Sequence, residues 1–88
     1  MVYLIHFNKA FGHARHYIGW TKDESTLPPR VEHHRKGSGA RLMAAVSAAG
    51  IGFDVVRTWP DGDRAKERSL KGFHGPRLCP VCKRRHAA

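Results

Sequence analysis

The sequence contains only two cysteines in 88 residues, Cys79 and Cys82, and they are close neighbours. A disulfide between them would close a very short loop and connect no distant parts of the chain, which excludes a disulfide-stabilised scaffold. No apolar run approaches the roughly 20 residues needed to cross a bilayer. The segment from Met1 to Ile5 lacks the charged start and the cleavage site of a signal peptide. We therefore expect a cytoplasmic protein with no membrane partner.

Acidic residues are also scarce. Asp and Glu number 7 against 16 Lys and Arg, which gives a formal net charge of +9 with neutral histidines. Such an excess of positive charge is typical of proteins that bind polyanions, so nucleic acid is the first partner to consider. The length leaves room for one small domain with a single core. Because 41% of the residues are hydrophobic, most of the chain is expected to be ordered.

Three segments have the composition of β-strands. β-branched and aromatic residues are concentrated at residues 2–7, 15–20 and 51–59. Residues 8–13, which include Gly12, are expected to connect the first two strands. Because this connector is short, the first two strands should pair in an antiparallel arrangement.

Three further segments are predicted to be helices, at residues 28–36, 40–49 and 64–71. The expected N-terminal caps are Ser25 or Thr26 for the first helix and Asp61 or Asp63 for the last. The order of the elements is strand, strand, helix, helix, strand, helix. This order predicts an α/β fold, with a small, mainly antiparallel three-stranded sheet flanked by helices.

The composition changes near residue 71. Residues 1–71 contain all the predicted elements and are expected to form the domain, whereas residues 72–88 form a basic tail that contains Cys and His. The tail contains no acidic residue, and glycine and proline interrupt any helix there. We expect it to be loop-like unless something holds it in place.

Five side chains have the chemistry that phosphodiester hydrolysis requires. The reaction needs a positive clamp on the developing charge, a carboxylate that holds a hard cation, and a group that deprotonates water. Tyr3 and Tyr17 lie on paired strands, and Arg30 and His34 lie one turn apart on one helix. Glu67, on the last helix, is the only acidic residue after Asp63.

Each of these residues also has an ordinary interpretation. Tyr3 and Tyr17 can be strand aromatics that pack against the helices. Glu67 and Lys71 are separated by one helical turn, so Glu67 can be a solvated charge in a surface ion pair that adds about 0.3–0.5 kcal/mol. The pattern of motifs, more than any single residue, favours the chemical interpretation.

Four motifs, in order, resemble those of the GIY-YIG nuclease superfamily. Residues 2–5 (VYLI) are similar to its first motif, and residues 17–21 (YIGWT) are similar to its second. Residues 30–34 (RVEHH) keep the Arg-x-x-x-His spacing of the family, and residues 39–42 (GARL) follow as in the branch related to structure-specific endonuclease subunits. Glu67 lies where the family places its metal-binding glutamate. The resemblance covers about residues 1–71.

The resemblance implies a metal-dependent DNA endonuclease that hydrolyses phosphodiester bonds. Glu67 would bind one divalent cation, Mg²⁺ or Mn²⁺, and Arg30 would hold the scissile phosphate. Tyr3 would act as, or orient, the general base, which requires its pKa to fall beside the metal or neighbouring cations. Tyr17 and His34 would position water or phosphate.

The positive charge also predicts DNA contacts outside the catalytic set. The expected phosphate contacts are Arg35, Lys36, Arg41 and Lys71. The main alternative function is a non-catalytic nucleic-acid binding module that retains the GIY-YIG fold, and a third is a structural zinc module that docks onto a protein. A chain of this size has no room for a separate recognition domain, so specificity would come from short loops, a protein partner or a homo-oligomer.

The tail contains a candidate zinc site. Cys79 and Cys82 form a CxxC pair, and His74 and His86 flank it, which gives four side chains of the types that bind zinc. Reduced thiols without metal are an alternative, and a redox pair is less consistent with a position beyond the last helix. His6, His13 and His16 have no clear role at this level.

Overall fold

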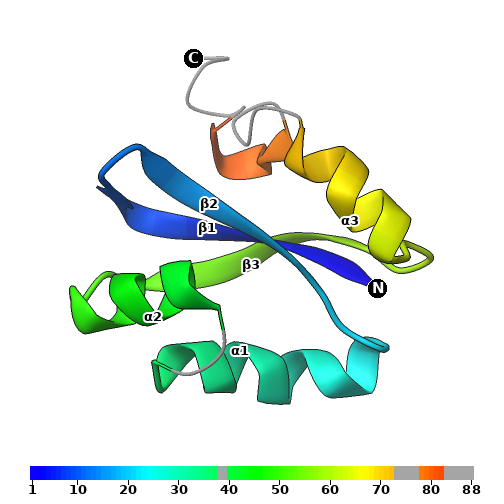
Figure 1. Ribbon diagram of the computed structural model, residues 1–88, viewed down its shortest axis with the longest axis horizontal. Helices are drawn as coiled ribbons and strands as arrows, with labels where there is room; N and C mark the ends of the chain where they lie inside the picture. The colour runs from blue at the N-terminus through cyan, green and yellow to red at the C-terminus, as the bar shows by residue number, and fades with distance from the viewer. Residues whose placement is uncertain (38–39, 73–77, 83–88) are drawn as a thin grey trace.

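A three-stranded antiparallel sheet forms the centre of the computed structural model (Figure 1). The structure describes residues 1–37, 40–72 and 78–82. The strands are β1 (Val2–Phe11), β2 (Ala14–Trp20) and β3 (Phe53–Trp59). Their order in the sheet is β2-β1-β3, so β1 is the central strand and pairs with both neighbours. The predicted α/β class with a small antiparallel sheet is confirmed.

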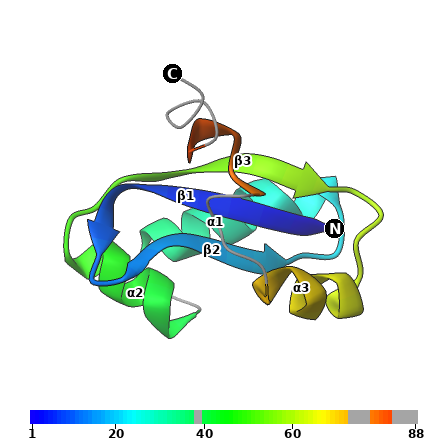
Figure 2. The same ribbon diagram turned by 90° about the horizontal axis from the view of Figure 1, so that it is seen from above.

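Helices cover both faces of this sheet (Figures 1 and 2). One face is covered by α1 (Leu27–Arg35) and α2 (Arg41–Ala48). α3 (Arg64–Lys71) lies along the β2 edge of the sheet, and residues 78–82 lie on the face opposite α1 and α2. The six predicted elements therefore occur in the predicted order. No helix in the described ranges is long and apolar enough to cross a bilayer.

The first strand is longer than its hydrophobic pattern predicts. Residues 8–13 were expected to form a connector, but β1 continues to Phe11, which pairs with Ala14. Gly12 and His13 form the turn. Gly12 has a left-handed φ of 60°, a conformation that glycine adopts easily. Backbone pairing, including a 2.8 Å hydrogen bond from the Asn8 amide to the Gly52 carbonyl, extends the strand through exposed residues. The hydrophobic pattern of the sequence does not predict this extension, because the added residues are exposed.

Alternation along β1 places successive side chains on opposite faces. Tyr3, Ile5 and Phe7 pack with Met43 and Val46 beneath the sheet. On the opposite face, β1 contributes to a second hydrophobic cluster, whose buried members are Val2, Leu4, Ile18, Leu70, Cys79 and Cys82. Because both faces are covered, every residue of β1 up to Phe7 is buried.

Aspartates cap two of the helical segments. Thr26, one of the two expected caps, is the N-cap residue of α1, but its side chain makes no capping hydrogen bond there, and a 3-10 turn, η1 (Glu24–Thr26), precedes α1. The Asp23 carboxylate accepts hydrogen bonds from the Ser25 hydroxyl and from the Ser25 and Thr26 amides, and these bonds, the hydroxyl's first, lower the pKa of that carboxyl group. At α3, the Asp63 carboxylate accepts from the Lys66 amide at 2.8 Å, so Asp63 is the cap and Asp61 is not.

Part of the tail belongs to the packed structure. Cys79 and Cys82 are buried in the same cluster as Leu70 of α3, and Leu78 and Val81 pack against it. Arg57 of β3 donates a 3.1 Å hydrogen bond to the Leu78 carbonyl. Tertiary contacts therefore hold residues 78–82 against the sheet. His74 and His86 lie outside the described residues.

Candidate functional site

Three aromatic rings meet on the face of the sheet that α1 covers. The hydroxyl of Tyr3 and Nε2 of His34 are joined by a hydrogen bond of 3.0 Å. The ring of Tyr17 lies edge-on to that of His34, with 5.4 Å between centroids, and 6.3 Å from the ring of Tyr3. Tyr3 and His34 are fully buried, whereas Tyr17 is half-buried.

The antiparallel register explains why the two tyrosines meet. Tyr3 lies opposite Gly19, and Ile5 lies opposite Tyr17. Tyr3 and Tyr17 are therefore diagonal neighbours on one face, at a separation that aromatic side chains can bridge. His34, on the last turn of α1, is the buried residue of that helix and contacts both rings.

Gly19 makes room for the Tyr3 ring. A methyl group at position 19 would overlap the Tyr3 ring and hydroxyl and would approach Cε2 of Tyr17 to 2.9 Å. Tyr3 lies at the centre of the sheet and cannot move away without disturbing the core. Glycine at this position is therefore required by the close approach of the two strands' side chains.

We expect Gly19→Ala to lower the free energy of unfolding by about 1–3 kcal/mol, as overpacked cores do. Denaturant unfolding of the two proteins measures the difference. Gly72→Ala is the matched control, because among the described residues a methyl group there meets only the Ser69 carbonyl, at an ordinary 3.4 Å. Equal losses in both variants would contradict a specific conflict with Tyr3.

The charges of Arg30 and Glu67 act on both tyrosines. Burial raises the pKa of Tyr3, a hydrogen bond and the positive charge of Arg30 lower it, and the negative charge of Glu67 raises it. The pKa of Tyr17 is also raised, by burial first and then by Tyr3, with Arg30 lowering it and Glu67 raising it. Among the groups of the chain, burial outweighs Arg30, so the fall in the pKa of Tyr3 that a general base requires stays a prediction for the cation-bound protein. Both tyrosines carry their protons at neutral pH.

The structure thus places Tyr3, Tyr17 and His34 in contact, and the charges of Arg30 and Glu67 act on both tyrosines. We call these five predicted catalytic residues the tyrosine cluster: Tyr3, Tyr17, Arg30, His34 and Glu67. They come from β1, β2, α1 and α3. Arg30 is exposed and lines an open groove with Thr21, Thr26, Pro29 and His33. The Glu67 side chain is 19% exposed and forms an ion pair of 3.5 Å with Lys71. Solvent therefore reaches the charged members, while Tyr3 and His34 lie beneath them.

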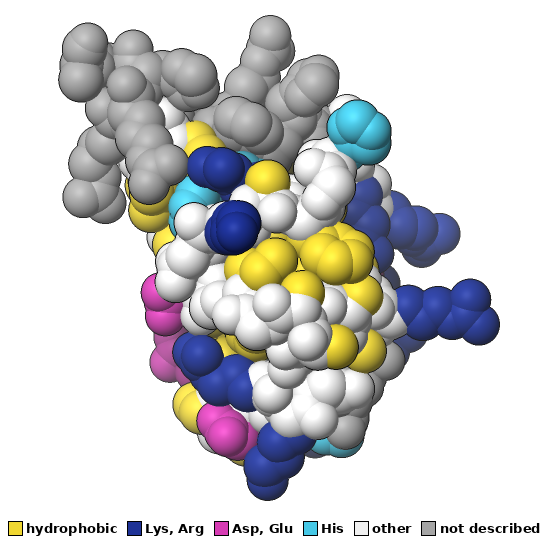
Figure 3. Space-filling view, turned by 90° about the vertical axis from the view of Figure 1, so that its left-hand side faces the viewer, with side chains coloured by type: hydrophobic (Ala, Val, Ile, Leu, Met, Phe, Trp, Pro, Cys, Tyr) yellow, Lys and Arg dark blue, Asp and Glu magenta, His cyan; other side chains and the backbone are white. Residues whose placement is uncertain are grey.

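The predicted phosphate contacts have different surroundings. Arg35 lies 3.8 Å from the Asp54 carboxylate and its guanidinium lies 4.9 Å from the centre of the Phe53 ring. Lys36 and Arg41 are exposed beside the ends of α1 and α2, and Lys71 is paired with Glu67. On the side that carries the β1–β2 turn and α2, basic side chains surround a small hydrophobic area (Figure 3). Their contacts with DNA stay a prediction.

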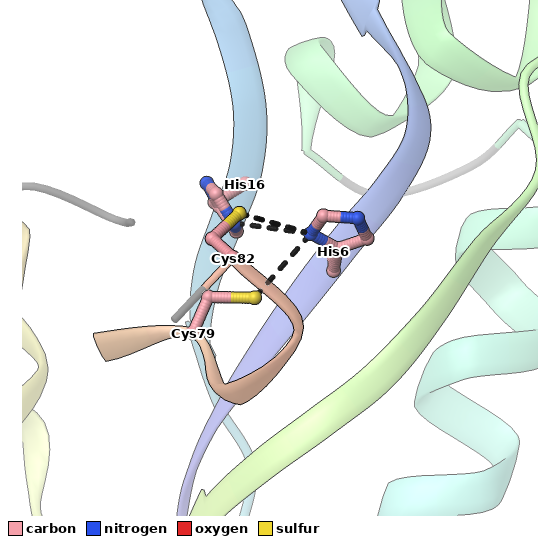
Figure 4. Close-up of side chains that lie close together, drawn as sticks. All are labelled: His6, His16, Cys79 and Cys82. Carbon is pink, nitrogen blue, oxygen red and sulfur yellow. Dashed lines mark hydrogen bonds between the residues drawn. The ribbon is translucent and has the colours of Figure 1, made fainter. Parts of the chain in front are cut away.

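A second cluster lies on the opposite face of the sheet, and we call it the His/Cys cluster: His6, His16, Cys79 and Cys82. One ligand atom from each residue lies within 4.8 Å of the other three (Figure 4). The two cysteines do not form a disulfide. Burial, His6 and Arg15 lower the pKa of His16 to about 4, so its imidazole is neutral at neutral pH. This cluster can hold a metal ion.

The histidines at this site are not the ones that the sequence predicted. It paired the cysteines with His74 and His86, whereas the structure brings His6 and His16 to them. The sequence did contain a signal for His6 and His16. Side chains alternate along a strand, so if Tyr3 and Tyr17 share one face of an antiparallel pair, His6 and His16 share the other. His6 and His16 are direct partners in the register. The sequence did not predict that the tail packs beside these histidines, because local patterns do not predict the position of a tail.

No protein-family model, curated protein or solved structure matches the chain. Its functional assignment therefore depends on the chemistry of these two clusters.

Proposed function

We propose that the protein is a cytoplasmic, metal-dependent DNA endonuclease of the GIY-YIG type, which hydrolyses phosphodiester bonds. The observation that carries the proposal is the tyrosine cluster, in which the rings of Tyr3, Tyr17 and His34 meet and the charges of Arg30 and Glu67, from two further positions on α1 and α3, act on both tyrosine hydroxyl groups. The net charge of +9 supports a polyanionic substrate.

The accessible members of the cluster are the ones we expect to touch DNA. Arg30 would hold the scissile phosphate, because its exposed guanidinium offers a fork of donors that matches phosphate oxygens. The Glu67 carboxylate supplies the oxygen ligand that Mg²⁺ or Mn²⁺ prefers. When bound, such a cation would stabilise charge on the phosphate and lower the pKa of a water molecule. Lys71 would then release its ion pair with Glu67.

The buried members are better suited to positioning. Tyr3 is fully buried, protonated at neutral pH and hydrogen-bonded to His34, so we propose that it orients the attacking water through its neighbours and is not itself the base. Tyr17 is half-buried, so its hydroxyl is the one of the two that would contact water or phosphate directly. The Tyr3–His34 pair would fix the position of Tyr17 and Arg30.

A cleavage assay on branched, nicked and duplex DNA tests the proposal. The protein is incubated with each substrate with and without added Mg²⁺ or Mn²⁺. The cation should be omitted and not chelated, since a chelator would also remove metal from the His/Cys cluster. Cation-dependent cleavage of any substrate would support the nuclease. Binding to DNA without cleavage under every condition would favour the alternative, a nucleic-acid binding module that retains the fold.

Both functions require DNA affinity that depends steeply on salt. Each Lys or Arg contact to phosphate should add about 0.9 to the slope of log affinity against log salt concentration. Arg41→Gln should reduce the slope by nearly that amount. Arg35→Gln should reduce it less, because Asp54 already compensates part of the Arg35 charge. Fluorescence anisotropy at several salt concentrations measures the slopes. A DNA affinity that does not change with salt concentration would contradict both functions.

A further inference from the structure

We propose that the His/Cys cluster is a closed, four-coordinate zinc site that fastens residues 78–82 to the β1–β2 hairpin. It would be a structural site, separate from the cation that we propose at Glu67. The proposal does not depend on nuclease activity, because it concerns the face of the sheet opposite the tyrosine cluster.

The distances within the cluster match a tetrahedral zinc site. Zinc binds histidine nitrogen at about 2.0–2.1 Å and thiolate sulfur at about 2.3 Å, so a tetrahedron has edges of about 3.3 Å between nitrogens and about 3.6 Å between nitrogen and sulfur. Nδ1 of His6 lies 3.2 Å from Nε2 of His16. The measured nitrogen–sulfur separations are 3.3 and 3.7 Å from His6 to Cys79 and Cys82, and 3.4 Å from His16 to Cys82.

Ordinary hydrogen bonds do not account for this arrangement. The Nδ1 atom of an imidazole has either one hydrogen or one lone pair. Three atoms nevertheless lie within 3.7 Å of Nδ1 of His6, and the dashed lines in Figure 4 converge on it. All four ligand atoms lie within 4.8 Å of one another, and four of their six separations are close to the edge lengths of a tetrahedron, which is better explained by a cation between them.

The donor set selects the metal and its role. Two thiolates and two imidazoles are the Cys₂His₂ ligands of structural zinc sites, and they exclude Mg²⁺ and Ca²⁺, which prefer oxygen. All four coordination positions are supplied by the chain, so none is left for a substrate or a reactive water. His6, Cys79 and Cys82 are also buried. A closed and buried site serves stability and not catalysis.

The site would connect segments that are distant in the sequence. His6 and His16 are opposite each other on β1 and β2, and Cys79 and Cys82 come from beyond α3. The cysteines share their hydrophobic cluster with Leu70 of α3. Zinc would therefore hold residues 78–82 on the sheet and, through Leu70, stabilise the position of α3. Metal binding then contributes directly to the folding of this half of the molecule.

Metal analysis of protein purified without chelator tests the site. We expect about one zinc per chain in the unaltered protein and in the control His13→Gln, whose histidine lies exposed in the β1–β2 turn. His16→Gln and Cys82→Ser should weaken zinc affinity at least roughly 100-fold, since each removes a ligand and loss of an outer-shell partner alone costs about 10–100-fold. The same zinc content is expected in Glu67→Gln, which separates this site from the nuclease proposal.

Cobalt substitution keeps the test valid if a variant does not fold. Co²⁺ bound to the unaltered protein should show the intense visible bands of tetrahedral coordination and a thiolate-to-cobalt charge-transfer band. The proposal is wrong if the protein takes up neither metal at stoichiometric amounts, or if Co²⁺ shows octahedral spectra without thiolate bands. It is also wrong if His74→Gln or His86→Gln removes the metal and His16→Gln does not.

Discussion

Replacing Glu67 by Gln is expected to abolish metal-dependent DNA cleavage and to leave the fold intact. The cation needs a fixed anionic ligand, and its loss removes several kcal/mol of transition-state stabilisation, which we expect to slow cleavage by roughly 10³-fold or more. The lost ion pair with Lys71 costs only about 0.3–0.5 kcal/mol of stability. DNA affinity should be retained or increase, because a negative charge that faces phosphate has been removed.

The control for this variant is Glu32→Gln. Glu32 is an exposed acid on α1, so the change in net charge is the same, but cleavage should continue at nearly the original rate. Full cleavage by Glu67→Gln under the same conditions would contradict the assignment of Glu67 as the cation ligand.

A tyrosine titration tests the position of Glu67 without an activity assay. The chain contains two tyrosines, Tyr3 and Tyr17, so the ultraviolet absorbance of tyrosinate reports on the tyrosine cluster alone. Both pKa values are raised above 10.0, and the charge of Glu67 is one cause in each case. In Glu67→Gln both pKa values should move downward. Because the tyrosines' pKa values are higher in the folded state, the stability due to their protonated form should be lost as the pH rises above 10.

Replacing Arg30 by Ala is the second change with a large expected effect. A single oriented donor to a developing charge is worth about 2–4 kcal/mol, so cleavage should slow by about 30- to 1,000-fold. Arg30→Lys should recover only part of this loss, because an ammonium group cannot donate to two phosphate oxygens in a fixed geometry. Single-turnover cleavage at saturating protein measures the chemical step without the change in affinity.

Two further measurements separate catalysis by Arg30 from general DNA attraction. Arg68→Ala removes an exposed charge from α3 and should leave the single-turnover rate nearly unchanged. In Arg30→Ala the pKa of Tyr3 should rise further, because Arg30 lowers it in the unaltered protein. If Arg68→Ala and Arg30→Ala slow cleavage equally, Arg30 acts only through the overall charge.

Much of the tyrosine cluster could be predicted from local patterns. Strand periodicity and a short connector put Tyr3 and Tyr17 on neighbouring strands, and helical periodicity put Arg30 and His34 on one face. These placements depend on interactions between residues close in sequence or in adjacent elements, which propensity and alternation describe well. The upward shift in the pKa of Tyr3 could not be predicted from these placements, because it depends on how completely the helices bury the ring.

Residue patterns alone established the order of six elements, the fold class and the motifs that suggest phosphodiester chemistry. Three-dimensional packing established the length of β1 and the partners of Cys79 and Cys82. His6 and Cys79 are brought to a nitrogen–sulfur distance of 3.3 Å although 73 positions separate them in the chain. No local preference encodes such a contact, because it forms only when the sheet, α3 and residues 78–82 bury a shared hydrophobic cluster.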